Sequence, residues 1–589
     1  MFQSLIKWSA VGAVAMTAFA AQPFTAKQLV SAQEAAPIAD YLNRYHPVMA
    51  RKGVVVAQEE HAAAAGYQMI EQGGNAIDAA VATAFALAVT YPQAGNIGGG
   101  GFIVAYIAEE DKVVALDFRE MAPQGAGRDM FLKKDGSVDR FKAMWTAQSS
   151  GVPGTVMGLT EAHKKYGSLP LKTVLAPAIK LAEKGFTLPW GIASSLAGRK
   201  QRLSRDADTA GYFFKPSGDA YAAGENFKQV DLAKTLRAVA DQGADGFYKG
   251  WVADKIVAKM QQTGGLITHK DLENYKAVWR PVVRNSYRDY EVVSMPPPSS
   301  GGVHVVQMLN VLEGFDLPRM GHNSAKYIHT LSETMKYAYA DRSHYLGDPD
   351  FADVPIKKLV NKRYAAHIRQ GITDRATPSA QIKPGMKMPK ESPQTTHLST
   401  MDAAGNAVSL TYTLNFSYGN GISVGGAGFL LNNEMDDFSA KPGVPNAFGL
   451  LGGEANAIEA GKRPLSSMTP TMVLKDGKPF FVTGSPGGSR IITAVLQTIL
   501  NVTDFKMNAA TAVSVPRVHH QWMPDEILIE SGISIDTARL LQAMGQNVDP
   551  YKKGSWRTIG AVQAIMRGKD GVMMGAADPR RQGAVAIGK

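Results

Sequence analysis

The sequence predicts an α+β protein in which helices are layered on sheets. Its 589 residues are 45% hydrophobic and 20% charged, which is the composition of an ordinary globular protein with a large core. Helical and strand patterns occur along most of the chain, but they do not repeat as strand-helix units. A doubly wound parallel sheet needs such repetition, so the pattern favours α+β.

The first twenty residues have the pattern of a secretory signal. Lys7 precedes an apolar run from Trp8 to Phe19, and the run ends in the small-x-small cleavage site Ala18-Phe19-Ala20. The alternative, a membrane anchor, is disfavoured because the run is shorter than the roughly 20 residues that span a bilayer. We therefore expect export to the periplasm, removal of residues 1–20 near Ala20, and no membrane anchor in the mature protein.

Composition excludes several classes of function. Cysteine is absent, which rules out disulfides, zinc thiolate sites and a cysteine nucleophile. The formal net charge is +11, but the basic residues are dispersed apart from small clusters such as 199–202, so no nucleic-acid partner is expected. His519 and His520 lack a partner at metal-ligand spacing, and no His-Glu-x-x-His motif occurs. We therefore expect neither a metal nor a cofactor.

The N-terminal part contains material for a core. Its expected elements are a strand at 52–57, a helix at 61–72, and an alanine-rich helix at 76–89 that Asn75 caps. A glycine run at 95–101 then precedes a strand at 102–107. Such a run can cradle a phosphate, but this one stands before a strand and lacks a following Lys-Ser/Thr pair. Close backbone packing is therefore the favoured interpretation.

A second strand, expected at 113–118, ends just before Arg119. An arginine at a strand end is usually part of a surface ion pair, and it becomes a candidate carboxylate ligand only where other such groups converge. Helical patterns then alternate with loops as far as Thr330. The main helices are expected at 171–184, at 230–242, at 303–314 after a rigid proline-rich loop, and from an Asn323 cap to Asp341.

The junction at Thr395 is the first candidate for chemistry. The segment before it, 375–393, contains four prolines and no sustained apolar period, which is typical of a flexible tether. After it, two short strands are expected around a turn, the second at 407–414. A threonine hydroxyl is a nucleophile only if a base takes its proton. Cleavage before Thr395 would supply one, because a new α-amine has a pKa of about 7.7–8.0 and activates its own hydroxyl.

Two downstream segments carry polar side chains in suggestive places. The strand at 407–414 has a polar face that ends in Thr413 and Asn415, and this face is either a solvent-exposed sheet surface or part of a site. The segment 429–438 places Glu434, Asp436 and Asp437 after an apolar strand. These acids fit a metal, a substrate ammonium or the capping of a loop.

The C-terminal part adds a loop, a hairpin and a glycine pair. The loop at 442–463 has the size and composition of a lid. A hairpin at 471–482 leads into a turn and then a helix at 491–501. Gly487 and Gly488 precede this helix, and their backbone N–H groups suit an oxyanion, although a plain tight turn explains them equally well. A strand-rich region at 526–587 ends the chain.

A rival nucleophile is Ser423. The segment Gly421–Gly425 matches the Gly-x-Ser-x-Gly pattern of serine hydrolases. That motif requires a helix directly after the serine, whereas here the glycine-rich loop continues. A serine hydrolase is therefore disfavoured.

Five motifs together resemble the γ-glutamyltranspeptidases in order and spacing. They are Gln394–His397, Thr411–Asn415, Leu431–Phe438, Lys462–Met468 and Thr483–Gly488, and the likeness also includes Leu116–Pro123 and nearly the whole mature chain. The resemblance implies an N-terminal nucleophile hydrolase, an αββα sandwich in which two stacked, mainly antiparallel sheets lie between helical layers. It also implies a zymogen that cleaves itself between Gln394 and Thr395. The products would be a large subunit, 21–394, and a small catalytic subunit, 395–589, which form a heterodimer.

The resemblance also implies roles for individual residues. Thr395 would attack the γ-glutamyl amide of glutathione or another γ-glutamyl compound, Thr413 would orient it, and Gly487 and Gly488 would hold the oxyanion. The substrate α-carboxylate would be bound by Arg119, Ser466 and Ser467, and its α-ammonium by Asn415, Glu434 and Asp437. The γ-glutamyl group would then pass to water or to an amino acid or dipeptide acceptor, so the resemblance implies a glutathione hydrolase and a γ-glutamyltransferase.

Two positions vary within this resemblance. The lid of similar bacterial enzymes carries a tyrosine that hydrogen-bonds across the pocket, and Phe448 stands at the matching place here. Phenylalanine covers a substrate but cannot make that bond, so we expect a looser lid. Some relatives have glutamine where this chain has Glu434, and the additional charge is expected to strengthen ammonium binding.

Two other interpretations remain open at this point. A related acylase acting on β-lactam side chains would keep Thr395, the cleavage and the glycine pair, but would have less need of Arg119 and the acid pair. A non-catalytic exported binding protein would use the same pocket and would never be cut.

Overall fold

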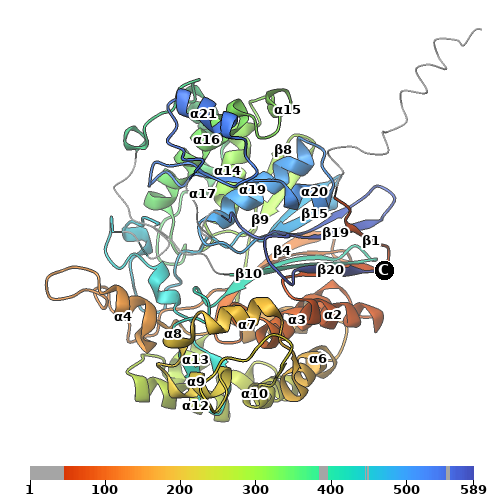
Figure 1. Cartoon of the computed structure of the whole chain (residues 1–589), viewed down its shortest axis with the longest axis vertical. Helices are drawn as coiled ribbons and strands as arrows, with labels where there is room; N and C mark the ends of the chain where they lie inside the picture. Colours follow the sequence, from red (N-terminus) through yellow and green to blue (C-terminus); the bar gives the residue numbers. More distant parts are fainter. Residues whose placement is uncertain (1–44, 384–394, 445, 447–449, 552–557) are drawn as a thin grey trace, which may run out of the picture.

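Two stacked sheets between layers of helices form the protein (Figure 1). The computed structural model describes residues 45–383, 395–444, 446, 450–551 and 558–589. The expected signal segment, 1–20, and the expected site residues Gln394 and Phe448 lie outside these ranges. Among the described strands, the larger sheets contain seven each, and every neighbouring pair in them is antiparallel. The αββα prediction is confirmed.

The first sheet has the strand order β20-β2-β10-β11-β3-β4-β7. Its strands are β2 (Gly53–Ala57), β3 (Gly100–Ile107), β4 (Lys112–Phe118), β7 (Val278–Arg280), β10 (Thr396–Asp402), β11 (Ala407–Thr413) and β20 (Val585–Gly588). Strands from before and after Thr395 are interleaved, because β10 pairs with β2 and β11 pairs with β3. The two parts of the chain therefore share one ladder of backbone hydrogen bonds.

The second sheet has the order β1-β19-β18-β15-β14-β9-β8. Its strands are β1 (Val48–Ala50), β8 (Val283–Tyr287), β9 (Tyr290–Ser294), β14 (Thr471–Lys475), β15 (Lys478–Gly484), β18 (Gln563–Arg567) and β19 (Met573–Ala577). The hairpin of β14 and β15 was predicted. The strands β7, β8 and β9 were not, because each has five residues or fewer and lies among helical patterns.

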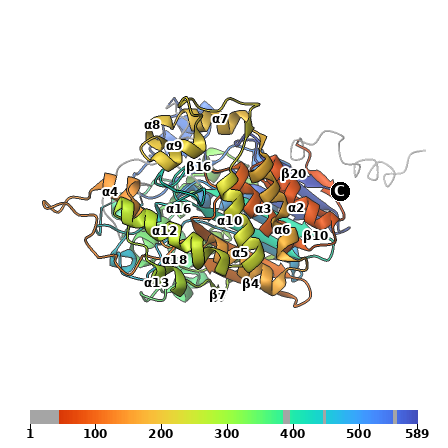
Figure 2. The ribbon, with the colours of Figure 1, turned by 90° about the horizontal axis from the view of Figure 1, so that it is seen from below.

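One helical layer covers the first sheet (Figure 2). Its helices are α2 (Glu60–Glu71), α3 (Ala76–Thr90), α5 (Thr155–Tyr166), α6 (Leu171–Lys184), α7 (Trp190–Ala197), α8 (Lys200–Leu203), α9 (Ala207–Phe213), α10 (Val230–Gln242), α11 (Asp245–Tyr248), α12 (Gly250–Thr263) and α13 (His269–Asn274). Asn75 caps α3 in a capping box with Asp78, as predicted. Every residue of α3 is buried, which explains its many alanines: a helix enclosed on all sides needs small side chains.

The opposite layer covers the second sheet. Its helices are α14 (Gly301–Leu312), α15 (Leu317–Met320), α16 (Ala325–Tyr345), α17 (Ile356–Leu359), α18 (Lys362–Gln370), α19 (Arg490–Thr503), α20 (Ala509–Ser514) and α21 (Ile535–Ala543). The cap of α16 is Ser324, whose hydroxyl accepts from the N–H of Tyr327, so the predicted Asn323 cap is wrong. Within the described ranges, no helix is both long and apolar enough to cross a bilayer.

The remaining elements are short. They are α4 (Arg140–Trp145), the two-stranded pairs β5 (Phe186–Thr187) with β6 (Asn226–Phe227), β12 (Ser423–Val424) with β13 (Phe429–Leu430) and β16 (Val518–His519) with β17 (Leu528–Ile529), and the 3-10 turns at 147–149, 379–381, 434–437 and 454–456.

The glycine run before β3 is a place of close backbone packing, as predicted. A Cβ atom on Gly98 would meet the carbonyl oxygen of Leu430 at 2.1 Å, and one on Gly99 would meet that of Thr413 at 1.9 Å. Only glycine allows these contacts. The run thus sets the spacing between β3 and the end of β11.

The polar face of β11 lies between the two sheets. Ser409, Thr411 and Thr413 are all buried, and the Ser409 hydroxyl donates to the carbonyl of Thr483 on β15 at 2.9 Å. A solvent-facing surface, one of the two explanations considered for this face, is therefore wrong. Buried polar side chains need partners, and Thr411 has one in the ring of His397 at 2.8 Å, while the apolar residues of β11 face the helices.

The described start of the expected tether is bound to the rest of the protein. The N–H of Ala376 donates to the carbonyl of Met544, and that of Ser379 to the carboxylate of Asp525, both at 2.8 Å. Ile382 is buried. The prediction of a tether from Arg375 onward is wrong for these residues, because their partners lie more than 140 positions away in the sequence and no local pattern reports them.

Candidate active site

A pocket of about 310 Å³ lies where β10 begins and β11 ends. The residues that line it include many of those expected from the sequence: Arg119, Thr395, Thr413, Asn415, Glu434, Asp437, Ser466, Ser467 and Gly488. It is also lined by Arg342, Leu450, Met468, Ser489 and Ile491. Most of the lining residues are polar or charged.

The sheet register places Thr395 beside Thr413. Thr396 pairs with Tyr412, so the next pair along the ladder brings Thr395 opposite Thr413, on the face toward the second sheet. Their hydroxyl oxygens are 3.4 Å apart. The Thr413 oxygen also accepts from the N–H of Asn415 at 2.8 Å. That contact orients the Thr413 hydroxyl and leaves its proton available to the oxygen of Thr395.

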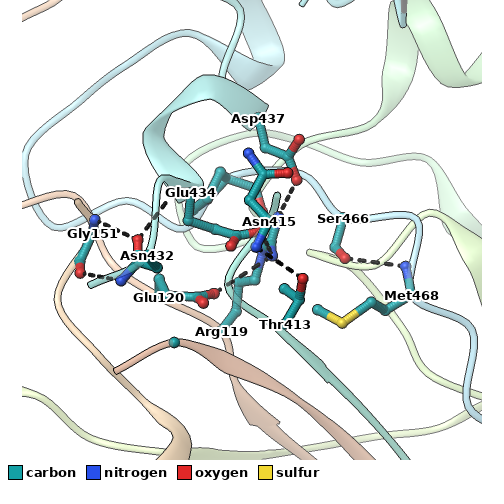
Figure 3. A network of polar contacts seen from close by, with 12 residues as sticks. Arg119, Glu120, Gly151, Thr413, Asn415, Asn432, Glu434, Asp437, Ser466 and Met468 are labelled. Carbon is teal, nitrogen blue, oxygen red and sulfur yellow. Dashed lines mark hydrogen bonds and ion pairs between the residues drawn. The ribbon is translucent and has the colours of Figure 1, made fainter. Parts of the chain in front are cut away.

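Arg119 is buried at the centre of an acidic cluster (Figure 3). Its guanidinium donates to Glu434, to Asp437 at 2.5 Å and to Glu120 at 3.5 Å. The remaining N–H groups donate to the carbonyls of Pro464 at 3.1 Å and Leu465 at 3.4 Å. The arginine expected to bind a substrate carboxylate therefore binds protein carboxylates in this structure.

Burial and charge set the ionisation of this cluster. Burial opposes the charged form of Arg119, but the neighbouring carboxylates outweigh it and raise the pKa of the guanidinium. Burial raises the pKa of Glu120 to about 7 and that of Glu434 well above its ordinary value, and it raises the pKa of Asp437 as well. Burial thus favours the neutral form of each of the three acids, while the charge of Arg119 favours the ionised form.

Asn432 fixes the segment that carries the acids. Its side-chain amide donates to the carbonyls of Gly98 and Gly151, and its side-chain oxygen accepts from the N–H groups of Gly151 and Glu434. Nearby, the side chain of Asn415 donates to the carbonyl of Asn433 at 2.9 Å. These bonds hold Glu434 and Asn415 at the pocket.

The serine loop, Ser466–Met468, is held by the segment just before α14. The N–H of Ser466 donates to the carbonyl of Pro298, and the N–H of Ser300 donates back to the carbonyl of Ser466, both at 2.8 Å. These bonds flank a short parallel bridge between Ser299 and Ser466. The serine loop therefore depends on a segment from the other part of the chain.

The glycine pair forms the turn between β15 and α19. Gly487 has φ +139° and Gly488 has φ +57°, both in the region that favours glycine. Gly488 lines the pocket, and Gly487 precedes it next to Gly560. Tyr339 of α16 holds the turn from behind, because its hydroxyl donates to the carbonyl of Ser489.

Other candidates lie elsewhere. Ser423 is buried in β12 and hydrogen-bonds to the hydroxyl of Thr209, and it is not a lining residue of this pocket. His519 contacts Thr493 and Gln521, and His520 contacts Asp525. Over the described ranges, no three His, Asp or Glu side chains are grouped as metal ligands.

Sequence reasoning missed three residues of this region: Glu120, Tyr339 and Arg342. Glu120 follows Arg119 directly, and its position in the sequence does not indicate that it belongs to the acidic cluster. Tyr339 and Arg342 lie within a long helical pattern, where a tyrosine or an arginine gives no local signal. Only the fold brings α16 to the pocket.

Comparisons with known proteins agree with the resemblance. The model of the γ-glutamyltranspeptidase family matches residues 62–588. The glutathione hydrolase proenzyme of Escherichia coli is 50% identical over 537 residues, which cover 91% of this chain and 92% of that protein. The acylase ACY 1 proenzyme of a Pseudomonas species is 37% identical over 556 residues, which cover 93% and 95%.

Two solved structures resemble the fold of this chain. A cephalosporin acylase from Bacillus halodurans superposes with a TM-score of 0.81 at 28% identity, and the match covers 94% of this chain and 99% of that one. A γ-glutamyltranspeptidase from Helicobacter pylori superposes with a TM-score of 0.55 at 46% identity, and the match covers 59% of this chain and 97% of that one.

Proposed function

The chain belongs to the γ-glutamyltranspeptidase family, and we propose that Thr395 is its nucleophile. It is a self-processing glutathione hydrolase and γ-glutamyltransferase with the N-terminal nucleophile hydrolase fold. One observation carries the assignment of the nucleophile: Thr395 lines the same small pocket as the Arg119 cluster, the serine loop and Gly488. The pocket therefore combines the proposed nucleophile, the oxyanion turn at Gly487 and Gly488, and groups that suit the carboxylate and the ammonium of an amino acid.

Maturation is the first reaction of Thr395. Its hydroxyl oxygen attacks the carbonyl carbon of Gln394, the peptide C–N bond breaks, and the hydroxyl proton passes to the departing nitrogen. Water then hydrolyses the resulting ester, which leaves a carboxylate on Gln394 and a free α-amine on Thr395. The products are a large subunit that ends at Gln394 and a small subunit that begins at Thr395.

Turnover uses the new amine as the base. The α-amine takes the hydroxyl proton of Thr395 while the oxygen attacks the γ-carbonyl carbon of the substrate. The oxyanion accepts from the N–H groups of Gly487 and Gly488. When the C–N bond breaks, the ammonium returns the proton to the leaving amine. Thr413 keeps the nucleophile oriented through its hydroxyl, 3.4 Å away.

The same pocket recognises the glutamyl group. Arg119, Ser466 and Ser467 bind its α-carboxylate, while Asn415, Glu434 and Asp437 bind its α-ammonium. Because Arg119 is already bonded to Glu434 and Asp437, the substrate inserts its own two charges into an existing ion pair. The γ-glutamyl group is then transferred from its ester with Thr395 to water, or to the amine of an amino acid or dipeptide acceptor.

Two measurements on the purified protein test this proposal. Denaturing electrophoresis with N-terminal sequencing should give two fragments, the smaller beginning at Thr395, together with release of the anilide from γ-glutamyl anilide. A Thr395→Ala variant should remain intact and inactive, and processing that persists in this variant would refute the mechanism. Fractionation of the native host should recover the activity from the periplasm, where the pattern of residues 1–20 directs it.

A cephalosporin-type acylase is the second candidate, because the structural match to the Bacillus halodurans acylase covers almost the whole chain. Glutaryl anilide separates the two activities, since it keeps the α-carboxylate position of the γ-glutamyl group and lacks its α-ammonium. We expect γ-glutamyl anilide to be the better substrate, because the buried acids at 434 and 437 favour an ammonium. A preference for glutaryl anilide would favour the acylase.

A further inference from the structure

The long helix α16 brings a second arginine, Arg342, to the pocket. Arg342 is 4% exposed and lines the pocket together with the serine loop. Its Nη2 donates to the hydroxyl of Ser467 at 3.2 Å, and its Nε donates to the hydroxyl of Ser300 at 2.9 Å. A guanidinium from the part of the chain before Thr395 thus orients a serine from the part after it.

Ser300 extends this contact to the other serine of the loop. The Ser300 hydroxyl donates to the carbonyl of Ser466 at 2.7 Å while its oxygen accepts from Arg342. Arg342 therefore contacts the hydroxyl of Ser467 directly. It reaches the backbone carbonyl of Ser466 through the hydroxyl of Ser300. A charged donor on a neutral hydroxyl also polarises it, so that the hydroxyl becomes a stronger donor to an anion.

Neighbouring contacts make α16 a rigid support. Asp341, next to Arg342, accepts from Gln307 at 2.5 Å and from Tyr364 at 2.9 Å. Tyr339, one turn earlier, donates to the carbonyl of Ser489 in the oxyanion turn. Residues three apart lie on the same helix face, so one face of α16 supports both the serine loop and the glycine turn.

The two arginines of the pocket have different electrostatic surroundings. The charge of Arg119 is shared among three carboxylates, and an incoming carboxylate must compete with them. Arg342 donates to the hydroxyls of Ser300 and Ser467, at the end of the pocket where the serine loop lies, and its charge also acts on the carboxylate of Asp437. A substrate carboxylate at this end meets hydroxyls with a positive charge directly behind them.

We infer that Arg342 is a positioning residue that makes the pocket selective for a substrate with an α-carboxylate. It fixes the hydroxyl of Ser467 and, through Ser300, the backbone of Ser466, and it supplies a positive charge behind them. This inference rests on the proposed function, because it concerns the binding of the glutamyl group at that same site.

Three anilides and two variants test it. The anilides are γ-glutamyl, glutaryl without the α-ammonium, and 4-aminobutanoyl without the α-carboxylate. In Arg342→Gln we expect kcat/KM to fall about 10- to 100-fold for the two carboxylate-bearing anilides, mainly through KM, since hydrogen bonds from charged groups have this worth. For the 4-aminobutanoyl anilide we expect kcat/KM to change less than about threefold. Arg342→Lys should recover part of the loss.

The control is Arg369→Gln. Arg369 of α18 is partly buried and donates to the carbonyl of Asn310 at 2.7 Å, and it is not a lining residue of the pocket. Its loss should leave the ratio of the three anilides unchanged. Autoprocessing, followed on a gel, reports whether each variant folds.

The outcomes separate this inference from the proposed function. Equal losses on all three anilides would show that Arg342 is only structural and would overturn the inference, while a wild-type preference for γ-glutamyl anilide would still support the function. A wild-type preference for another acyl group would instead refute the function. If neither Arg342 variant folds, Ser300→Ala combined with Ser467→Ala decides, because the pair removes both hydroxyls to which Arg342 donates. An unchanged ratio in that variant overturns the inference.

Discussion

Arg119 donates to Glu434 at the centre of the pocket, so the cation and one of the anions that we propose to bind the substrate are bonded to each other. Asp437 and Glu120 complete this arrangement. The charges of the site thus compensate one another, and under the proposed function a zwitterionic substrate would exchange its own charges for those of the protein. Free carboxylates or free ammonium compounds cannot replace both partners at once.

Removal of the charge of Glu434 should therefore have opposite effects on two substrates. In Glu434→Gln we expect the KM of γ-glutamyl anilide to rise about tenfold, because a charged hydrogen bond to the ammonium is lost. Glutaryl anilide should instead bind more tightly, because Arg119 is released from a competing carboxylate. Steady-state kinetics on both anilides checks this, and a parallel change of the two KM values would contradict it.

The contact between Thr395 and Thr413 predicts a loss in kcat. Thr413→Val keeps the shape of the side chain and removes the hydroxyl that contacts Thr395 and accepts from Asn415. We expect kcat to fall about 10- to 100-fold and autoprocessing to slow, with KM little changed. Thr413→Ser should restore most of the activity. Thr411→Val, on the same face of β11 but bonded to His397, serves as the matched control and should keep its kcat.

The buried acids predict a pH dependence of binding. The pKa of Glu120 is raised to about 7, so the free cluster holds an additional proton below this pH, and an ammonium must displace it. We expect the Ki of L-glutamate to fall up to about tenfold per pH unit between pH 5.5 and 7, and to level off above. Glu120→Gln should flatten this slope.

Glutarate is the control ligand for that experiment, because it carries no ammonium. A similar slope with glutarate would mean that a group other than the acid cluster titrates. Inhibition constants are preferable to kcat, because an ordinary N-terminal α-amine has a pKa of about 8 and the proposed base at Thr395 would affect catalysis separately.

The backbone conformation of Gly487 predicts that its replacement disrupts the turn whose N–H groups are proposed to hold the oxyanion. At φ +139° a side chain is strained, and a Cβ atom would meet the Cα of Gly560 at 3.2 Å. We expect Gly487→Ala to lower kcat about 10²- to 10³-fold. Gly477→Ala in the hairpin has a comparable positive φ, at +76°, and open space around its Cβ. It should cost stability of about 1 kcal/mol and leave kcat unchanged.

The contacts of Asp525 predict how tightly residues 375–383, near the end of the proposed large subunit, are held against the rest of the protein. Its carboxylate accepts from the N–H of Ser379 and faces His520 and Lys336. Asp525→Asn should expose the bonds near residues 375–383 to limited proteolysis without a change in the KM of γ-glutamyl anilide. Asp536→Asn, on exposed α21, is the control and should be cut at the wild-type rate.

Local patterns in the sequence predicted those elements whose determinants are local. The helices α6 and α10 begin and end at the predicted residues, and Asn75 caps α3, because periodicity and capping involve residues a few positions apart. The cap of α16 was misplaced by one residue, since two polar residues stand side by side and only the backbone distinguishes them. The strand β7 was missed because it has three residues and lies among helical patterns.

Features that depend on distant contacts were not predictable in this way. Most expected pocket residues came from the resemblance to a family, because composition alone left Thr395 as a suspicion. Arg342 was found only through the fold, which packs α16 against the serine loop. The bond between Arg119 and Glu434 was also missed, because sequence motifs name binding residues and do not say what these bind in the absence of a substrate.

The interleaved first sheet has a consequence for the lifetime of the enzyme. Strand β10 begins directly after Thr395 and is hydrogen-bonded on one edge to β2, which precedes the proposed cleavage site by more than 300 residues. Before cleavage the two meet as parts of one molecule, whereas after cleavage any refolding is a bimolecular encounter at cellular dilution. The mature enzyme then persists through slow unfolding rather than through reversible equilibrium. Its activity, once lost by heat, should return only from newly made precursor.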